Sequence, residues 1–211
     1  MDNKGILIVI SGFSGAGKGT VVKEILRQYD DYVLSVSMTT RAPRTGERDG
    51  VEYFFTTVEK FEETIAAGGL LEYASYCGNY YGTPKAYVEN MLASGKNVIL
   101  EIEVQGGTQI KELFPESLLL FVTPPSAQEL ENRLRARGTE TEEVILQRLA
   151  RASQEVPYMK DYEYIVINDN LQRCVSDIHS IVDAARSKPD RKKNFIETID
   201  EDLKQISKGA K

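Results

Sequence analysis

The chain has 211 residues, a length that suits one compact α/β domain with a subdomain or two. Its net charge is -6 at pH 7 with 27% charged residues, which argues against a nucleic-acid binder that relies on a basic surface. Hydrophobic residues make up 41% of the chain, yet no stretch approaches the roughly 20 apolar residues of a membrane span. We therefore expect neither a nucleic acid nor a membrane as a partner.

The cysteine and histidine content excludes further classes of site. Two cysteines, Cys77 and Cys174, are too few for a disulfide framework or a zinc site, and the single histidine, His179, makes His-based catalysis unexpected. The residues before the first apolar run lack the basic start of a signal peptide, and that run is too short to serve as one. We expect a cytoplasmic protein with reduced thiols.

The first predicted elements are a strand, a glycine-rich turn and a helix. Ile6–Ile10 is a continuous, mostly β-branched apolar run, which is typical of a buried central strand in a parallel sheet. Lys18–Tyr29 has apolar residues at helical spacing. Further strands are expected at Val98–Ile102, Leu118–Val122 and Tyr164–Ile167, with helical patterns at Ile110–Leu113, Ala127–Arg137 and Leu171–Ala185. This alternation predicts a parallel sheet with crossover helices.

Three stretches depart from the alternation. Between Val33 and Tyr81, the short alternating runs VLSVS, EYFF and LLEYASY and a helical pattern near Val58–Ala67 predict a small mixed-β insertion. Arg133–Glu155 is charged and weakly apolar, which favours a mobile flap over a core layer. Beyond Ser187, a narrow apolar stripe indicates a terminal helix that docks on the body or on a partner.

The turn after the first strand, GFSGAGKGT, has the composition of a phosphate-binding loop. Its residues are Gly12, Phe13, Ser14, Gly15, Ala16, Gly17, Lys18, Gly19 and Thr20. In a strand–loop–helix context the backbone N–H groups converge, the helix N-terminus adds positive potential, and Lys18 reaches the β- and γ-phosphates. A plain glycine-rich turn with an exposed lysine is the alternative. The residue after the lysine is Gly19 instead of the usual Ser or Thr, so Thr20 reaches Mg²⁺ either directly or through water.

A second anion site is predicted from two arginines. Arg41 and Arg44 lie three residues apart beside Pro43, which stiffens the backbone between them. Two guanidinium groups held in this way form a fork for a dianionic phosphate, and Tyr53 adds a hydroxyl donor. The alternative is a solvated basic loop.

Several motifs together resemble the guanylate kinase family. The segment Ser35–Phe55, SVSMTTRAPRTGERDGVEYFF, is similar to the family pattern, and the loop GFSGAGKGT resembles those of nucleoside monophosphate kinases. The similarity continues through Glu72, GNYYGT (78–83), EIEVQG (101–106), RGTET (137–141) and IND (167–169), in order. It covers nearly everything from Ile6 to about Ala185.

The resemblance implies an architecture and an activity. The fold would be α/β: the P-loop nucleoside monophosphate kinase fold, with a five-stranded parallel sheet flanked by helices, a mixed-β GMP-binding insertion and a helical lid. The core would comprise residues 1–35, 92–132 and 156–186, the GMP-binding insertion 36–91, the lid 133–155 and a helical C-terminal extension 187–211. The activity would be direct in-line transfer of a phosphoryl group from ATP to GMP, and also to dGMP, with Mg²⁺. Monomer and homodimer both remain open.

The resemblance also implies roles for individual residues. The GMP phosphate would be held by Arg41, Arg44, Tyr53 and Tyr81, and the guanine would be surrounded by Ser37, Glu72, Thr83 and Glu103. On the ATP side the loop would be joined by Arg133, Arg137 and Asn168, with Thr20 and Glu101 near the metal. The catalytic residues would be Lys18, Arg41, Arg137 and Arg148. At position 103 this chain has Glu where the family commonly carries Asp.

Guanine recognition by Glu72 has an independent chemical rationale. Guanine presents N1–H and an amino group on one edge, and an ionised carboxylate can accept from both. Adenine presents a lone pair at N1, so the same carboxylate would disfavour it. Taken alone, Glu72 could also be a surface residue on a strand.

Two alternatives for the function stay open: a phosphopeptide-binding module without catalysis, which the intact loop disfavours, and a kinase for another monophosphate such as AMP.

Overall fold

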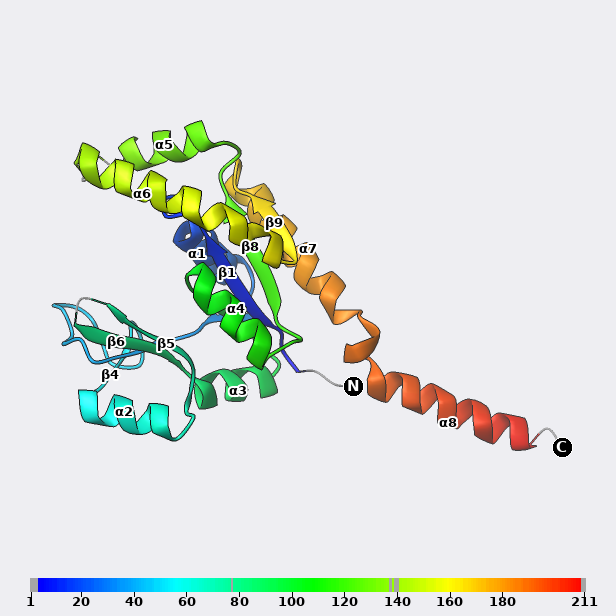
Figure 1. Cartoon of the computed structure of the whole chain (residues 1–211). Helices are drawn as coiled ribbons and strands as arrows, with labels where there is room; N and C mark the ends of the chain where they lie inside the picture. Colours follow the sequence, from blue (N-terminus) through cyan, green and yellow to red (C-terminus); the bar gives the residue numbers. More distant parts are fainter. Residues whose placement is uncertain (1–3, 77, 137, 139–140, 210–211) are drawn as a thin grey trace.

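The computed structural model describes residues 4–76, 78–136, 138 and 141–209, and its centre is a five-stranded parallel sheet (Figure 1). The strand order is β2-β7-β1-β8-β9, and every neighbouring pair is parallel. The strands are β1 (Leu7–Gly12), β2 (Tyr32–Leu34), β7 (Asn97–Glu101), β8 (Leu118–Thr123) and β9 (Tyr164–Ile167). This confirms the expected α/β fold. The carboxyl ends of β1, β7 and β8 meet at one edge, where ligands bind in such sheets.

The alternation of side chains along β1 divides the core into two layers. Ile8 and Ile10 pack on one face of the sheet with helices α1 (Lys18–Gln28) and α7 (Leu171–Arg186). Val9 points to the other face, where the cluster includes residues of α3 (Lys85–Ala93) and α4 (Val104–Leu113). Because both faces are covered, the strand is apolar from Leu7 to Ile10, as its sequence predicts.

A smaller mixed sheet forms the insertion. It has the order β4-β3-β6-β5 and is built from β3 (Met38–Thr39), β4 (Phe54–Phe55), β5 (Leu70–Tyr76) and β6 (Asn79–Pro84). Helix α2 (Val58–Ala66) covers it, with Phe61 fully buried and stacked on Tyr80. The expected assignment of VLSVS to this insertion is wrong in part: its first residues belong to β2, the edge strand beside β7 in the main sheet. Alternation of apolar and polar residues is expected of a half-exposed strand in either sheet, so the pattern does not tell to which sheet a strand belongs.

Two helices form the arm above the phosphate loop (Figure 1). They are α5 (Ala127–Ala136) and α6 (Glu142–Glu155), and the short 3-10 helix η1 (Val156–Asp161) leads back to β9. Leu130, Leu134 and Ile145 are buried in this arm, which gives it apolar contacts of its own despite its charged composition.

The C-terminal segment continues as a helix that leaves the body. After η2 (Pro189–Arg191), α8 (Lys193–Gly209) extends away from the core (Figure 1). The expected apolar stripe is present but exposed, from 44% at Ile199 to 70% at Ile206. Of the two expected positions for this helix, docking on the body is therefore not observed. Among the described residues, no helix is long and apolar enough to cross a membrane.

Candidate functional site

The phosphate loop joins the central strand β1 to α1, and its geometry depends on glycine. A Cβ on Gly12 would lie 2.0 Å from the carbonyl oxygen of Val122 in the adjacent strand. Gly17, the N-cap residue of α1, has a φ of +91°, in the left-handed region that glycine adopts without strain. Nζ of Lys18 donates to the carbonyl oxygens of Gly12 at 2.6 Å and Phe13 at 3.3 Å. Burial lowers the pKa of Lys18, whereas nearby carboxylates act against this shift.

Two residues expected on the ATP side, Asn168 and Arg133, and the expected catalytic residue Arg148 lie around this loop. Asn168 is buried after β9, and its Nδ2 donates to the carbonyl oxygen of Ala16 at 2.9 Å. Arg133 of α5 donates to the carbonyl oxygens of Asn168 at 2.8 Å and Ala16 at 3.3 Å. Arg148 of α6 donates from Nη1 to Oγ of Ser14 at 2.8 Å. Arg137, which was also expected here, lies outside the described residues.

The two candidate metal contacts lie beside the loop. Glu101 ends β7, in register with Ile10 of β1, and both of its carboxylate oxygens lie 3.7 Å from where a Cβ on Gly19 would be. Burial raises the pKa of Glu101, with Lys18 opposing that shift. Thr20 is exposed in the first turn of α1.

The expected phosphate-binding arginine is held by a neighbouring carboxylate. Nη2 of Arg41 lies 2.8 Å and 2.9 Å from the two carboxylate oxygens of Glu47, and the backbone N–H of Arg44 donates to Oε2 of Glu47 at 2.7 Å. The Arg41 guanidinium lies 5.3 Å from the ring centre of Tyr53, and this ring is 5.9 Å from that of Tyr81. Arg41, Tyr53 and Tyr81 are thus brought together, with the exposed Arg44 beside them.

The expected guanine contacts meet across strands β5 and β6. Oγ1 of Thr83 donates to Oε1 of Glu72 at 2.6 Å, and Thr83 is almost fully buried. Burial raises the pKa of Glu72, and the hydrogen bond from Thr83 acts in the opposite direction. Glu72 is therefore not an ordinary surface glutamate.

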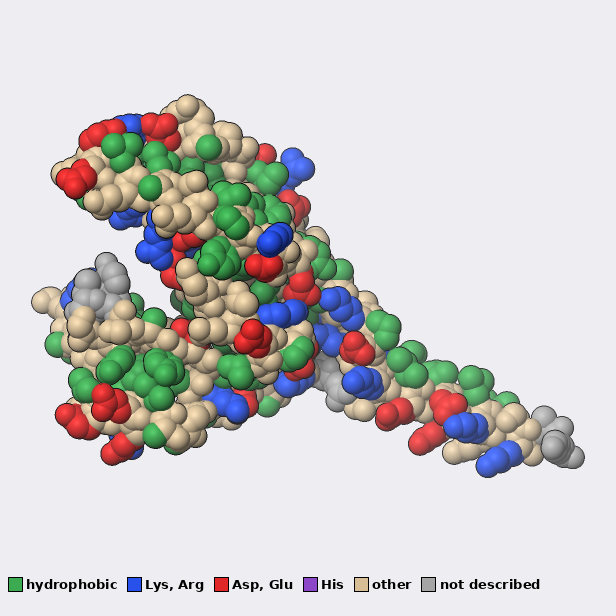
Figure 2. Space-filling view, viewed as in Figure 1, with side chains coloured by type: hydrophobic (Ala, Val, Ile, Leu, Met, Phe, Trp, Pro, Cys, Tyr) green, Lys and Arg blue, Asp and Glu red, His purple; other side chains and the backbone are tan. Residues whose placement is uncertain are grey.

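One cavity connects the loop lysine to the acceptor residues. It has a volume of about 410 Å³, and its lining includes Lys18, Ser37, Tyr53, Thr83, Glu101 and Glu103. Figure 2 shows the molecule hollowed between the lid helices and the insertion. The cavity places the candidate phosphate loop and the candidate acceptor site in one continuous space.

Comparison with known proteins identifies the family of the chain. A family model described as guanylate kinase matches residues 4–185. The chain belongs to the guanylate kinase family. A member of this family is a phosphotransferase, so the chain is an enzyme of that class.

Similar guanylate kinases come from several bacteria. The chain is 51% identical over 193 residues to the guanylate kinase of Clostridioides difficile, covering 92% of this chain and 94% of the relative. It is 48% identical over 203 residues to that of Clostridium perfringens, covering 96% of this chain and 94% of the relative. The crystal structure of guanylate kinase from Anaplasma phagocytophilum is similar with a TM-score of 0.67 and 31% identity, covering 88% of each chain.

Two residues that contact the site of this guanylate kinase family member were not selected from the sequence. Glu47 holds Arg41, and Arg151 of α6 contacts Glu103. A local signal existed for Glu47, because it follows the two arginines within six residues. Arg151 has a helical i,i+4 relation to Glu155, but nothing in the sequence places it beside Glu103.

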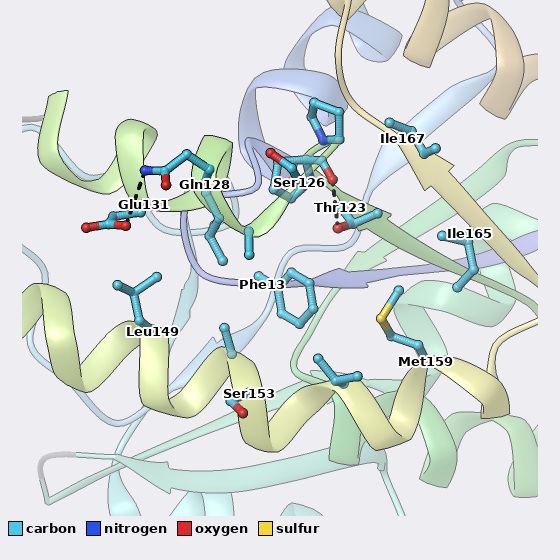
Figure 3. A pocket seen from close by; sticks show the side chains of 16 residues that line it. Phe13, Thr123, Ser126, Gln128, Glu131, Leu149, Ser153, Met159, Ile165 and Ile167 are labelled. Atoms are coloured by element: carbon cyan, nitrogen blue, oxygen red, sulfur yellow. Dashed lines mark hydrogen bonds between the residues drawn. The ribbon is translucent and has the colours of Figure 1, made fainter.

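A second cavity of about 690 Å³ lies between the lid helices and the β8–β9 edge (Figure 3). Its lining is mainly apolar and includes the ring of Phe13, Leu149, Met159, Ile165 and Ile167. Because the ring of Phe13 lines this cavity, we expect Phe13 to contribute to the phosphate loop through its backbone.

Proposed function

We propose that the chain transfers the γ-phosphoryl group of ATP to GMP, and also to dGMP, by direct in-line displacement. The observation that carries this proposal is the single cavity lined both by Lys18 of the phosphate loop and by the acceptor residues Tyr53 and Thr83. Two nucleotides bound at its two ends would meet through their phosphates. Family membership supports ATP and GMP as the two substrates.

The acceptor phosphate is proposed to bind to Arg41, Arg44, Tyr53 and Tyr81. A guanidinium group recognises a phosphate in the same fork geometry in which it binds a carboxylate. Nη2 of Arg41 contacts both carboxylate oxygens of Glu47, and the guanidinium lies 5.3 Å from the ring centre of Tyr53, so these two residues hold Arg41 in place. The cation is ordered before the substrate arrives, which lowers the entropic cost of binding.

Guanine is proposed to bind to Glu72 and Thr83, with Ser37 and Glu103 beside it. The carboxylate of Glu72 accepts from Thr83 and retains capacity to accept from guanine N1–H and the amino group. The hydroxyl of Thr83 donates, so it can turn to the guanine carbonyl oxygen when the base arrives.

The transfer itself needs no protein nucleophile. An oxygen of the GMP phosphate attacks the γ-phosphorus of ATP, the bond from that phosphorus to the β–γ bridging oxygen breaks, and ADP leaves with the electron pair. Lys18, Arg41, Arg137 and Arg148 are proposed to neutralise the charge that spreads over the transferred group. The lid that carries Arg148 would close to exclude water, which otherwise competes as acceptor.

The residues present fit a magnesium ion held largely by the substrates. Mg²⁺ keeps several waters and is usually bound by one or two carboxylates together with phosphates. Among the described residues no group of three or more His, Cys, Asp or Glu side chains could hold a metal, but Glu101 lies beside Gly19 of the loop. We propose that Glu101 orders water on the ion and that Thr20 contacts it directly or through water. When bound, Mg²⁺ supplies charge neutralisation of the phosphates.

Two other readings are disfavoured by particular residues. A phosphopeptide-binding module would not need an ATP loop, yet Lys18 and its loop are intact. An AMP kinase would face the mismatch between adenine N1 and Glu72. A cytoplasmic location is part of the proposal because ATP and GMP are cytoplasmic nucleotides; monomer and homodimer are both compatible with it.

The test of this function is a coupled assay for ADP release with GMP, dGMP, AMP, CMP and UMP offered in turn. We expect turnover with GMP and dGMP, and at least about 10²-fold lower kcat/KM with AMP, since a site built to hydrogen-bond rejects a mismatched partner strongly. Activity with AMP and none with GMP would overturn the substrate assignment.

Glu47 offers a test of the phosphate fork. In Glu47→Gln, Arg41 loses the carboxylate that contacts its Nη2 through both oxygens, and we expect the KM for GMP to rise about threefold to tenfold, the usual loss for one hydrogen bond. The KM for ATP should stay unchanged. The same substitution at the exposed Glu62 of α2 is the control. A GMP KM equal to that of the unmodified enzyme would remove Glu47 from the acceptor site.

A further inference from the structure

Arg151 of the lid helix α6 joins two carboxylates from separate parts of the fold. Its Nη2 lies 2.9 Å from Oε2 of Glu103, and its Nε lies 3.1 Å from Oε1 of Glu155. Glu155 is one helical turn further along α6 and is buried. Glu103 is 48 residues away in the sequence, at the N-cap of α4, and it lines the acceptor cavity. The guanidinium group thus ties the lid to the acceptor site.

The charges around Lys18 explain why such a cation is needed. Glu101, Glu103 and Glu155 lie close enough to Lys18 for each to raise its pKa, and Arg151 acts in the opposite direction. A site for two polyanionic nucleotides is weakened by carboxylates that lack a counterion, since like charges repel. By contacting both Glu103 and Glu155, Arg151 offsets two of the three carboxylates.

The contact also constrains the direction of Glu103. A carboxylate has two oxygens and about four acceptor positions, and Arg151 uses Oε2, so capacity remains for donors from a bound base. Glu103 has one methylene more than the Asp common in the family, which gives its carboxylate more freedom.

We propose that Arg151 is a positioning residue for the acceptor nucleotide: it holds the carboxylate of Glu103 through Oε2 and leaves the other oxygen to face the guanine in the cavity. This inference rests on the proposed function, in which GMP is the acceptor and Glu103 contacts its base. Arg151 touches neither nucleotide in this role and acts through Glu103. The long carboxylate at position 103 and the arginine at position 151 form one unit.

The test compares Arg151→Gln with Arg135→Gln. Arg135 of α5 is a matched control, because it also bridges two carboxylates on the lid, Glu131 and Glu142, at 2.9 Å and 2.8 Å. We expect Arg151→Gln to raise the KM for GMP about fivefold to tenfold with the KM for ATP changed less than about twofold, a loss typical of one hydrogen bond. Arg135→Gln should change neither. The KM for GMP of Arg151→Lys should lie between those of the unmodified enzyme and Arg151→Gln, since an ammonium group keeps the charge but lacks the planar fork.

A double-mutant cycle separates positioning from general charge. In Glu103→Gln the further change Arg151→Gln should add less than about twofold to the KM for GMP, because the contact between the two residues is already lost. Full additivity would overturn the inference, as would an unchanged GMP KM in Arg151→Gln while the unmodified enzyme phosphorylates GMP. Absence of GMP turnover in the unmodified enzyme would instead overturn the proposed function. If Arg151→Gln does not fold, Arg151→Lys replaces it, and an unchanged GMP KM there overturns the inference.

Discussion

Replacing Lys18 with alanine is expected to lower kcat at least about 100-fold, because the ammonium group stabilises charge that develops on the transferred phosphoryl group. In this structure Nζ of Lys18 is held by the carbonyl oxygens of Gly12 and Phe13, so the group is stored inside its own loop. We infer that the phosphates of ATP replace these two carbonyls as partners. Steady-state turnover at saturating ATP and GMP measures the effect.

The control for this change is Lys23→Ala. Lys23 is exposed on the same helix α1, so its replacement removes the same charge without reaching the cavity. We expect its kcat to stay within about twofold, since surface changes away from special features have small effects. The melting temperature of Lys18→Ala should also stay close to that of the unmodified protein, because the lost hydrogen bonds lie within one loop. Near-normal turnover in folded Lys18→Ala would contradict the assigned role.

The second large effect is expected at Glu72. Glu72→Gln replaces an acceptor-only carboxylate with an amide whose NH₂ group would face the donors of guanine. We expect GMP binding to weaken by about 1–3 kcal/mol, or roughly fivefold to 150-fold in KM, with the KM for ATP unchanged. The exposed Glu62 of α2 serves as the control in the same insertion, and Glu62→Gln should leave both KM values unchanged. Unchanged GMP affinity in Glu72→Gln would remove this residue from base recognition.

The pH dependence gives an independent readout of the same residue. Burial raises the pKa of Glu72, so its carboxylate takes up a proton at a higher pH than an ordinary glutamate. Guanine donors need the ionised form, and the affinity for GMP should therefore fall as the pH decreases through this raised pKa. Glu72→Gln cannot titrate, so this part of the decline should be absent there. Any decline that both proteins share belongs to other groups, among them the GMP phosphate, whose second pKa is about 6.

The elements that could be predicted from the sequence are those set by local constraints. A buried central strand must be apolar on both faces. The apolar run Ile6–Ile10 therefore predicts β1 without any information on the strands beside it. Glycine is required in the loop because of the positive φ angles there and because the backbone of Val122 lies close to Gly12. Helix α3, with Val88 and Leu92 buried, was not predicted, because a nine-residue helix with two buried apolar residues carries a weak periodic signal.

The candidate site also has a part that could be predicted from local sequence and a part that depends on tertiary packing. The phosphate loop and the pair Arg41 and Arg44 are read from residues close together in the sequence, since each site is made by one short segment. The contact of Arg151 with Glu103 joins residues 48 positions apart, and it depends on how α6 lies over the start of α4. No local pattern encodes that approach.

By itself, the sequence determined a glycine-rich loop after a buried strand and a segment that places two arginines three residues apart, for which we propose binding of the acceptor phosphate, because short-range geometry decides both. Tertiary structure alone decided that Lys18 and Thr83 line one cavity, that Glu47 holds Arg41, and that Arg151 reaches Glu103. The physical reason is that long-range contacts follow from the packing of whole elements, whereas propensity and spacing act over a few residues.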